Sequence, residues 1–279
     1  MKVCRTRKEI QACVGEWIRG GGAVALVPTM GALHAGHLSL VKAASSMADH
    51  VVVSIFVNPT QFGAGEDYEK YPRTEAADLM MCRDAGVAAV FAPEAGELYE
   101  ADASVFVDES ALSSDLCGKT RPGHFRGVLT VVMKLFNIIQ PDIAVFGQKD
   151  AQQVAVIERM VRDLDIPVRI IRAPTFRESN GLAMSSRNRY LTPEERQRAL
   201  CLSEALELAL DCWKNGERES AAVIQKMHDH ITRHSPEIEY IVCVDGATLK
   251  HTPELAPGVL IAIAVRIGAT RLIDNTLLR

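Results

Sequence analysis

The sequence predicts an α/β protein in which a doubly wound parallel sheet precedes a second, smaller α+β domain. Short apolar runs alternate with helical patterns over the first part of the chain, as expected when helices cover both faces of a parallel sheet. Beyond Arg172 this alternation stops, and two long helical stretches precede three strand-like runs. We therefore expect two domains, at residues 1–174 and 175–279.

The first domain is predicted to begin with a helix and a βαβ unit. Thr6 and Glu9 have the spacing of a capping box, so a helix is expected from there to the glycine run at Gly20. Apolar runs at 23–27 and 50–57 are predicted to be buried strands on either side of a helix at 36–48. The alternation continues with helix 72–84, strand 88–92, helix 127–139, strand 143–147, helix 151–163 and strand 168–172.

The second domain is predicted from a helix start at Thr192, which can cap a first turn that holds Pro193 and two glutamates. Helices are expected at 193–215 and 220–234, and strands at 238–244, 259–265 and 271–275.

Composition and charge exclude several classes of protein. Hydrophobic residues make up 48% of the 279 residues and charged residues 24%, as in ordinary globular proteins. A formal net charge of -4 with scattered basic residues argues against a nucleic-acid partner. No apolar run could cross a membrane and no signal core is present, so we expect a cytoplasmic protein. The seven cysteines include no Cys-x-x-Cys pair and are expected to be small buried side chains.

The clearest motif lies where the first buried strand gives way to a helix. Ligands bind at such strand ends in open parallel sheets, and the amides and dipole of a helix start attract phosphate. His34 and His37 are three residues apart there and can face one phosphate together; the alternative is that they only cap or pack the helix start. The nucleotide-binding segment would comprise Met30, Gly31, Ala32, Leu33, His34, Ala35, Gly36 and His37, with Pro28 before it.

A second strand end carries Lys149 and Asp150, which follow Gly147 and Gln148. A lysine is a mobile positive charge suited to phosphate oxygens, and an aspartate can accept hydrogen bonds from a ribose. Taken alone, this pair is more typical of a solvated turn.

A third segment, residues 180–188, lies just beyond the expected domain boundary. Its small residues, hydroxyl groups and one guanidinium suit a mobile clamp over a triphosphate, and the alternative is an ordinary polar linker. The residues concerned are Met184, Ser185, Ser186 and Arg187.

Uncharged amides follow the second buried strand, at Asn58 and Gln61, and another, Gln153, lies one helical turn after Asp150. Amides suit the hydroxyl groups of a small polar substrate, although each one taken singly is better explained as a satisfied loop group.

The His-x-Gly-His spacing resembles the signature of the nucleotidylyltransferase superfamily, and residues 180–188 resemble its flexible Lys-Met-Ser-Lys-Ser loop. Taken together the segments resemble pantothenate synthetase from Thr6 to about Leu191. The matching runs are Pro-Thr-Met-Gly-Ala-Leu-His from Pro28, Tyr-Pro-Arg-Thr from Tyr71, Arg-Pro-Gly-His-Phe from Arg121 and Met-Ser-Ser-Arg from Met184.

This resemblance implies a Rossmann-like first domain and an ATP- and Mg²⁺-dependent ligase that joins (R)-pantoate to β-alanine. The reaction would pass through an enzyme-bound pantoyl adenylate and release AMP and pyrophosphate, and the enzyme would be a homodimer. Adenylation replaces an oxide leaving group by AMP, which makes amide formation from a carboxylate feasible.

The resemblance also implies roles for individual residues. His34, His37, Lys149, Ser185 and Arg187 would bind phosphate, and His37 would also donate a hydrogen bond or proton as pyrophosphate leaves. The nucleotide would lie against Met30, the region of Gly147 and Asp150, and the backbone at Phe176. The substrate residues would be Pro28, Asn58, Gln61, Tyr71, Arg121, His124 and Gln153, and the candidate metal ligand is Asp78.

The chain departs from the family pattern beside several of these residues, at Ala35, Ala77, Gln148, Ala151 and Phe176. We expect changed packing rather than lost activity at Ala35, Gln148 and Ala151. Ala77 replaces a residue that is often an aspartate beside Asp78, which weakens the metal assignment.

Three alternatives remain at this stage. A transferase that passes a nucleotide to a phosphate ester would need a basic acceptor pocket, where this chain offers amides. A tRNA synthetase would need a basic surface, which the net charge does not suggest. A regulator that senses ATP without turnover would have little use for several phosphate-binding segments.

Overall fold

The computed structural model describes all residues, 1–279, and divides them into two compact units. Unit 1 consists of Met1–Gly147 and Gln152–Pro174, and unit 2 of Gln148–Ala151 and Thr175–Arg279. The short segment Gln148–Ala151 therefore packs with unit 2, although unit 1 contains the chain on both sides of it.

Unit 1 is built on a six-stranded parallel sheet with the strand order β1-β4-β3-β2-β5-β6. The central strands are apolar on both faces, as a parallel sheet covered on both sides requires. The strands are β1 (Lys2–Cys4), β2 (Val24–Thr29), β3 (His50–Ile55), β4 (Ala89–Phe91), β5 (Ile143–Gly147) and β6 (Arg169–Ala173).

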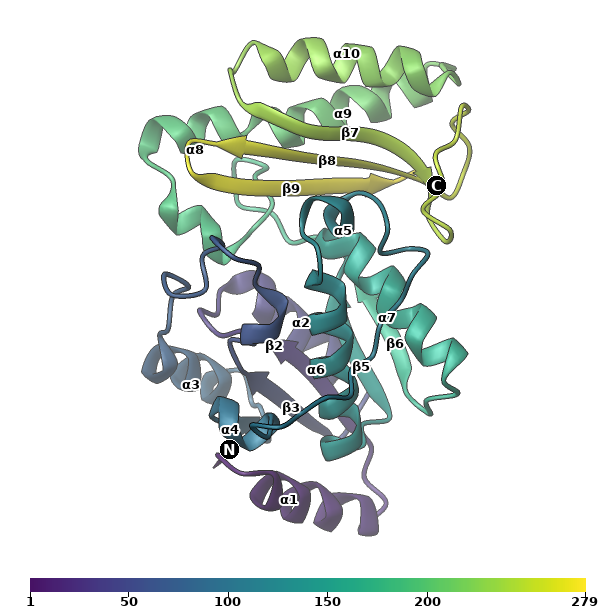
Figure 1. The fold of residues 1–279 in the computed structure, drawn as a ribbon. Helices are drawn as coiled ribbons and strands as arrows, with labels where there is room; N and C mark the ends of the chain where they lie inside the picture. Colours follow the sequence, from purple (N-terminus) through teal and green to yellow (C-terminus); the bar gives the residue numbers. More distant parts are fainter. The chain divides into compact units, whose positions relative to one another are not determined.

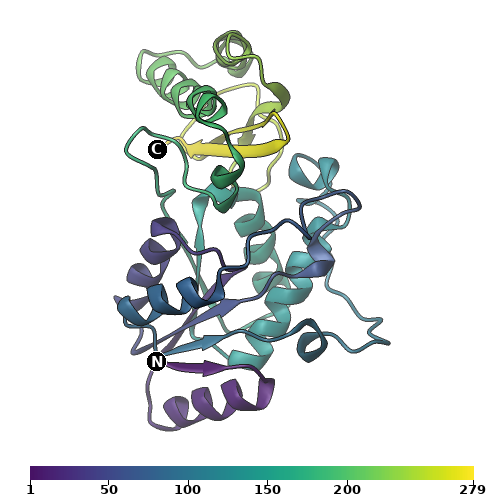
Figure 2. The ribbon, with the colours of Figure 1, turned by 90° about the vertical axis from the view of Figure 1, so that its left-hand side faces the viewer.

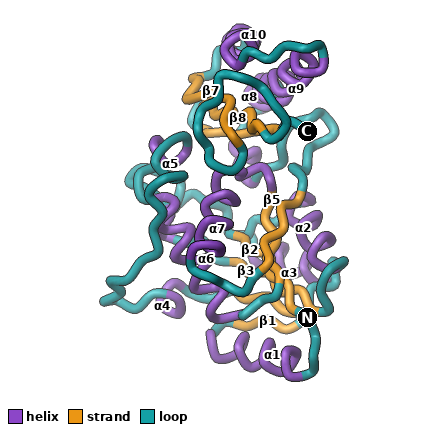
Figure 3. Tube along the Cα trace, turned by 90° about the vertical axis from the view of Figure 1, so that its right-hand side faces the viewer, coloured by secondary structure: helices purple, strands orange, loops and turns teal.

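Helices cover both faces of this sheet, which confirms the doubly wound prediction (Figures 2 and 3). On one face, Leu40 and Val41 of α2 (Ala35–Ser45) and Cys82 of α3 (Glu75–Asp84) pack against strand residues. On the other lie α6 (His124–Ile139) and α7 (Ala151–Asp163), and α1 (Arg7–Arg19) contacts α6. Shorter helices are η1 (Pro59–Gln61), α4 (Ala95–Leu98) and α5 (Cys117–Thr120).

Unit 2 is an antiparallel three-stranded sheet, β7 (Glu237–Asp245), β8 (Val259–Ile267) and β9 (Thr270–Leu277), with helices packed on one face (Figure 1). Leu202, Met227 and Ile231 from the helices form its core with Ile261 and Ile263 of β8. The helices are α8 (Pro193–Ala199), α9 (Cys201–Lys214) and α10 (Ser220–Thr232), with the short η2 (Gln148–Asp150) and η3 (Ser186–Tyr190).

Most predicted elements are present, and the capping box at Thr6 starts α1 as expected. The predicted helix 193–215 is wrong in one respect, because it is two helices that meet at Leu200. There the Leu200 N–H bonds to Gln197, a tighter turn than in an α-helix, and the Ser203 hydroxyl donates to the Leu200 carbonyl. The three-residue strand β1 and the four-residue helices α4 and α5 are too short to leave a periodic pattern.

All seven cysteines are buried, as expected. Burial raises the pKa of Cys82 and Cys243 to about 11 and that of Cys201 to about 12, so these side chains stay neutral thiols. None of the helices combines the length and the apolar composition that crossing a lipid bilayer requires.

Gly127 of α6 has no room for a side chain. A Cβ there would lie 2.3 Å from the Thr60 carbonyl oxygen and 2.6 Å from the Gln61 nitrogen, both backbone atoms of η1. We expect Gly127→Ala to displace η1 and lower the free energy of unfolding by roughly 1–3 kcal/mol, measured by urea denaturation. The control is Gly96→Ala in α4, where a Cβ meets nothing within 4 Å. Equal stability of the two variants would contradict this packing.

Candidate active site

The strand order of unit 1 reverses at β2. Strands β3 and β4 lie on one side of β2, and β5 and β6 on the other. Because β2 and β5 are parallel and paired in register at Ala25 with Ile143, their carboxyl ends lie at the same edge of the sheet. Open α/β sheets bind ligands at this switch point. The segment after β2 that holds His34 and His37 therefore begins at the place where a ligand is expected.

A buried carboxylate holds the turn that leaves β2. Asp78 of α3 is 1% exposed, and its two oxygens accept hydrogen bonds from the N–H groups of Ala32 (2.9 Å) and Leu33 (2.8 Å). The Thr74 hydroxyl donates to the same carboxylate at 3.1 Å. Gly31 and Ala32 have φ angles of 79° and 49°, and the left-handed value at Ala32 is a strained one for a residue with a side chain. Asp78 offsets this strain by satisfying both N–H groups.

His34 and His37 lie at the start of α2. Their rings stack with centroids 4.1 Å apart and an interplanar angle of 28°, so both imidazoles lie on the same side of the helix start. His34 is the N-cap residue with extended backbone, and its carbonyl accepts from the His37 N–H at 2.8 Å. The first turn of α2 has no acidic residue, so no carboxylate of its own neutralises the positive end of the helix dipole. This arrangement favours an anion.

The amides after β3 form a buried cluster. Asn58 is 1% exposed, its Oδ1 accepts from the Tyr99 hydroxyl at 3.0 Å, and its Nδ2 donates to the Gly127 carbonyl at 3.1 Å. Asn58 Nδ2 also lies 3.1 Å from Gln61 Oε1, and Gln61 Nε2 lies 3.2 Å from the sulfur of Met30. Gln61 therefore adjoins the turn after β2. Asn58 holds the Gln61 side chain in position. Tyr99 was not identified from the sequence.

A charged network holds the next predicted residues, Arg121 and His124. The Arg121 guanidinium donates to both oxygens of Glu66 at 2.7 Å, and its Nη1 lies 3.0 Å from His124 Nε2. His124 Nδ1 lies 2.9 Å from the Gln61 carbonyl. Because a guanidinium only donates and a carbonyl only accepts, the network fits neutral His124 with its proton on Nδ1. Burial works to raise the pKa of Glu66, but the hydrogen bonds and the positive charge of Arg121, together with smaller contributions such as that of the Gly63 backbone, outweigh it, and the pKa is lowered.

Lys149 belongs to a segment that unit 2 holds by its backbone. Asn275 of β9 donates to the carbonyl oxygens of Gln148 (3.0 Å) and Lys149 (2.8 Å), and accepts from the Gln148 amide at 3.2 Å. The Lys149 ammonium lies 3.6 Å from the Asp150 carboxylate. Asn275 was not identified from the sequence. The one signal that could have found it is an amide side chain within a predicted strand, and the structure shows that this side chain is buried.

The segment that carries Ser185 and Arg187 is anchored in unit 2. Arg177 donates to both oxygens of buried Asp274, at 2.6 and 3.0 Å, and to the Gly181 carbonyl. The Ser185 hydroxyl caps η3 by accepting from the Arg187 N–H at 3.3 Å. Ser185 and Arg187, which follow on the same segment, are half-buried.

The remaining predicted residues are distributed over both units. In unit 1, Tyr71 is buried edge-on against Phe62, and Gln153 is half-buried on α7. In unit 2, Phe176 is 42% exposed and its carbonyl accepts from the Met184 N–H at 3.0 Å. The ligand and metal roles of all these residues stay predictions.

A sequence model of the family described as Pantoate-beta-alanine ligase matches residues 2–277. The chain belongs to the pantoate-beta-alanine ligase family. It is 52% identical over 280 residues to the pantothenate synthetase of Moorella thermoacetica, covering 100% of this chain and 99% of that one. It is 50% identical over 279 residues to that of Thermotoga neapolitana, with both chains fully covered.

Solved structures of the family have the same fold. Pantothenate synthetase from Thermus thermophilus superposes with a TM-score of 0.95 at 40% identity, covering 99% of both chains. The ligase from Francisella tularensis, solved with "Beta-gamma ATP and Beta-alanine", gives 0.84 at 34% identity, covering 99% of this chain and 97% of that one. The activity of this chain is accordingly pantoate-β-alanine ligation in pantothenate biosynthesis, which decides against the three alternatives raised by the sequence.

The substitution Asp78→Asn tests whether the Asp78 carboxylate holds the turn that follows β2. An asparagine keeps one acceptor but turns its NH₂ group toward a backbone N–H, so two donors would face each other in a buried place. We expect the free energy of unfolding to fall by about 1–3 kcal/mol and kcat/KM to fall with it. Asp84→Asn, at an exposed position of the same helix, is the control. Unchanged stability and activity of Asp78→Asn would contradict this role for the carboxylate.

Glu66→Gln tests the charged network through its pH dependence. Since the folded pKa of Glu66 is lowered, its carboxylate stabilises the fold above the unfolded pKa, and this contribution disappears as the pH falls through the folded value. We expect the variant to be less stable than wild type near pH 7 and the gap to close below about pH 4. Urea unfolding at several pH values measures this. Glu69→Gln, at an exposed position nearby, should show no such gap.

Proposed function

We propose that this chain uses ATP to drive the ligation in two steps. In the first, a carboxylate oxygen of pantoate attacks the α-phosphorus of ATP, the bond from that phosphorus to the bridging oxygen breaks, and pyrophosphate leaves. In the second, the β-alanine amine attacks the acyl carbon of pantoyl adenylate, loses a proton, and AMP leaves. No side chain becomes covalently attached, so the contribution of the protein is alignment and charge stabilisation.

The stacked pair His34 and His37 carries this proposal. Two imidazoles on one side of a helix start, at the switch point of a parallel sheet, suit the phosphates of a nucleotide. We assign His34 to phosphate oxygens, and His37 to the same oxygens and to a hydrogen bond or proton for the departing pyrophosphate. A positioned acid typically adds about 10²–10⁴-fold to the rate.

Three further groups belong to the proposal. The mobile ammonium of Lys149 suits phosphate oxygens, and so do the Ser185 hydroxyl and the Arg187 guanidinium. Asn275 sets the backbone position of Lys149 and is therefore proposed as a positioning residue.

The remaining assignments place the substrates near the polar cluster of unit 1. Gln61 is proposed to bind pantoate with Gln153, and Asn58 to orient Gln61. Arg121 and His124 are proposed to lie beside bound β-alanine or the phosphates. The bond between Gln61 and His124 joins these two groups of residues, which supports their acting together.

Mg²⁺ belongs to the same proposal. It prefers one or two carboxylates together with substrate phosphates and water. Asp78 already accepts two backbone N–H groups, whereas the Asp150 side chain is 46% exposed and better fits such a place. When bound, the ion would neutralise charge on the phosphates. We further propose, from the family resemblance, a cytoplasmic homodimer.

The decisive measurement is AMP release from ATP and Mg²⁺, with and without D-pantoate and β-alanine. We expect steady AMP formation only with both substrates, and a fall in kcat/KM of about 100-fold or more for His37→Ala. His228→Ala, which removes an exposed histidine of α10, is the control and should retain activity.

Three other results of this assay would each contradict a particular part of the proposal. Stoichiometric AMP with pantoate alone, and no further AMP when β-alanine is added, would uphold the adenylate step and overturn the proposed second step. Turnover that is unchanged in His37→Ala would overturn the assignment of the histidine pair. No AMP from wild type under any of these conditions would overturn the proposed route.

A further inference from the structure

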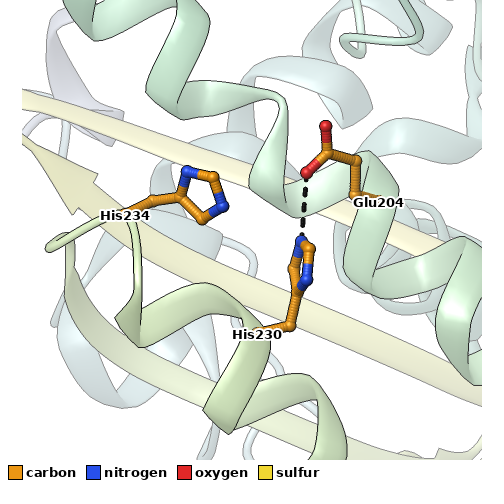
Figure 4. Close-up of side chains that lie close together, drawn as sticks. All are labelled: Glu204, His230 and His234. Carbon is orange, nitrogen blue, oxygen red and sulfur yellow. Dashed lines mark hydrogen bonds and ion pairs between the residues drawn. The ribbon is translucent and has the colours of Figure 1, made fainter.

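A cluster of metal-ligating side chains lies in unit 2, on two of the helices that cover its sheet and on the turn that follows the second of them. Glu204 of α9 faces His230 of α10, and His234 follows His230 by four residues. His234 lies in the turn just beyond the end of α10 at Thr232, and one ligand atom from each of the two histidines lies close to the Glu204 carboxylate. Figure 4 shows the three side chains converging. None of them has a role in the proposed reaction.

The distances are close to those of a coordination sphere. His230 Nε2 lies 3.0 Å from a carboxylate oxygen of Glu204, and one ligand atom from each residue lies within 4.8 Å of the other two. The rings of His230 and His234 have centroids 5.4 Å apart and an interplanar angle of 45°. Bonds of about 2.0–2.1 Å in a tetrahedral site put ligand atoms about 3.4 Å apart. A small rotation of His234 would therefore complete a three-ligand set.

The backbone around these residues is fixed, so metal binding would not have to order it. Val223, Met227 and Ile231 of α10 belong to the core of unit 2. Beyond the helix end, Arg198 of α8 donates to the carbonyls of His234 (2.8 Å) and Ser235 (2.6 Å). Both histidines are thus held in place by their backbones while their side chains stay accessible.

We propose that Glu204, His230 and His234 form a binding site for a divalent transition metal of the zinc class, which links α9 to α10. Two imidazoles and one carboxylate are a ligand set typical of Zn²⁺, and a water molecule would complete the fourth position. Imidazoles favour such ions over Mg²⁺, which takes oxygen ligands. The site is thereby distinct from the place proposed for Mg²⁺ in the ligase reaction.

The test is a titration of untagged full-length protein with Zn²⁺ by calorimetry, and with Co²⁺, whose visible absorption intensifies in four-coordinate sites. We expect one equivalent of either metal to bind, and to bind equally well when Mg²⁺ is present in excess. Since a ligand that binds only the folded state stabilises it, saturating Zn²⁺ should raise the Tm by roughly 5 °C. His230→Ala and His234→Ala should each weaken binding by about 100-fold or more, and Glu204→Gln should weaken it by a smaller factor.

Matched controls lie on the same two helices. His228→Ala on α10 and Glu207→Gln on α9 replace exposed side chains outside the cluster and should bind Zn²⁺ like wild type. An equivalent retained at full affinity in both His230→Ala and His234→Ala would place the metal elsewhere and overturn the proposal. So would the absence of any saturable equivalent in wild type. Ligase activity without added Zn²⁺ should be unchanged in His234→Ala, which separates this test from that of the proposed reaction.

Discussion

Two backbone N–H groups at the end of β2, those of Ala32 and Leu33, turn inward where water cannot reach them. Asp78 of α3 accepts both, and this contact determines where the chain can enter α2. A buried carboxylate is costly unless it is hydrogen-bonded, and here three donors satisfy it. The left-handed conformation at Ala32 persists because the hydrogen bonds to Asp78 stabilise it. The first histidine of the pair lies two residues further on, so the same turn determines where the pair begins.

The polar groups beside that turn depend on one another in the same way. Gln61 lies between Met30 and Asn58 through its side chain, and its carbonyl faces His124. Gly127 lets α6 approach η1 so closely that Asn58 reaches the Gly127 carbonyl. A fully satisfied network of this kind keeps its members in one arrangement before a ligand arrives. That rigidity is what a reaction governed by alignment requires.

The sequence predicted the elements whose signals are local and missed the contacts that are not. Caps such as Thr6 and apolar runs such as residues 50–57 define helices and buried strands within a few residues of chain. Asp78 meets Ala32 across 46 positions, and Asn275 meets Lys149 across 126. No periodic pattern carries that information. The histidine motif and the strand ends were found because a parallel sheet brings all its carboxyl ends to one edge, whereas the partners that hold them depend on tertiary packing.

The charges of both units fit substrates that are all anionic or zwitterionic. ATP and pantoate would be repelled by an unpaired carboxylate, and the buried or half-buried carboxylates beside the proposed residues are each neutralised in place. Asp78 is held by backbone N–H groups, Glu66 by Arg121, and Asp274 by Arg177. Asp150 differs in its exposure, because its carboxylate is half-exposed and pairs with the Lys149 ammonium at 3.6 Å. An accessible carboxylate beside the lysine that we propose to bind phosphate could share a cation with the nucleotide, which is the physical reason for proposing Mg²⁺ near Asp150 rather than at Asp78.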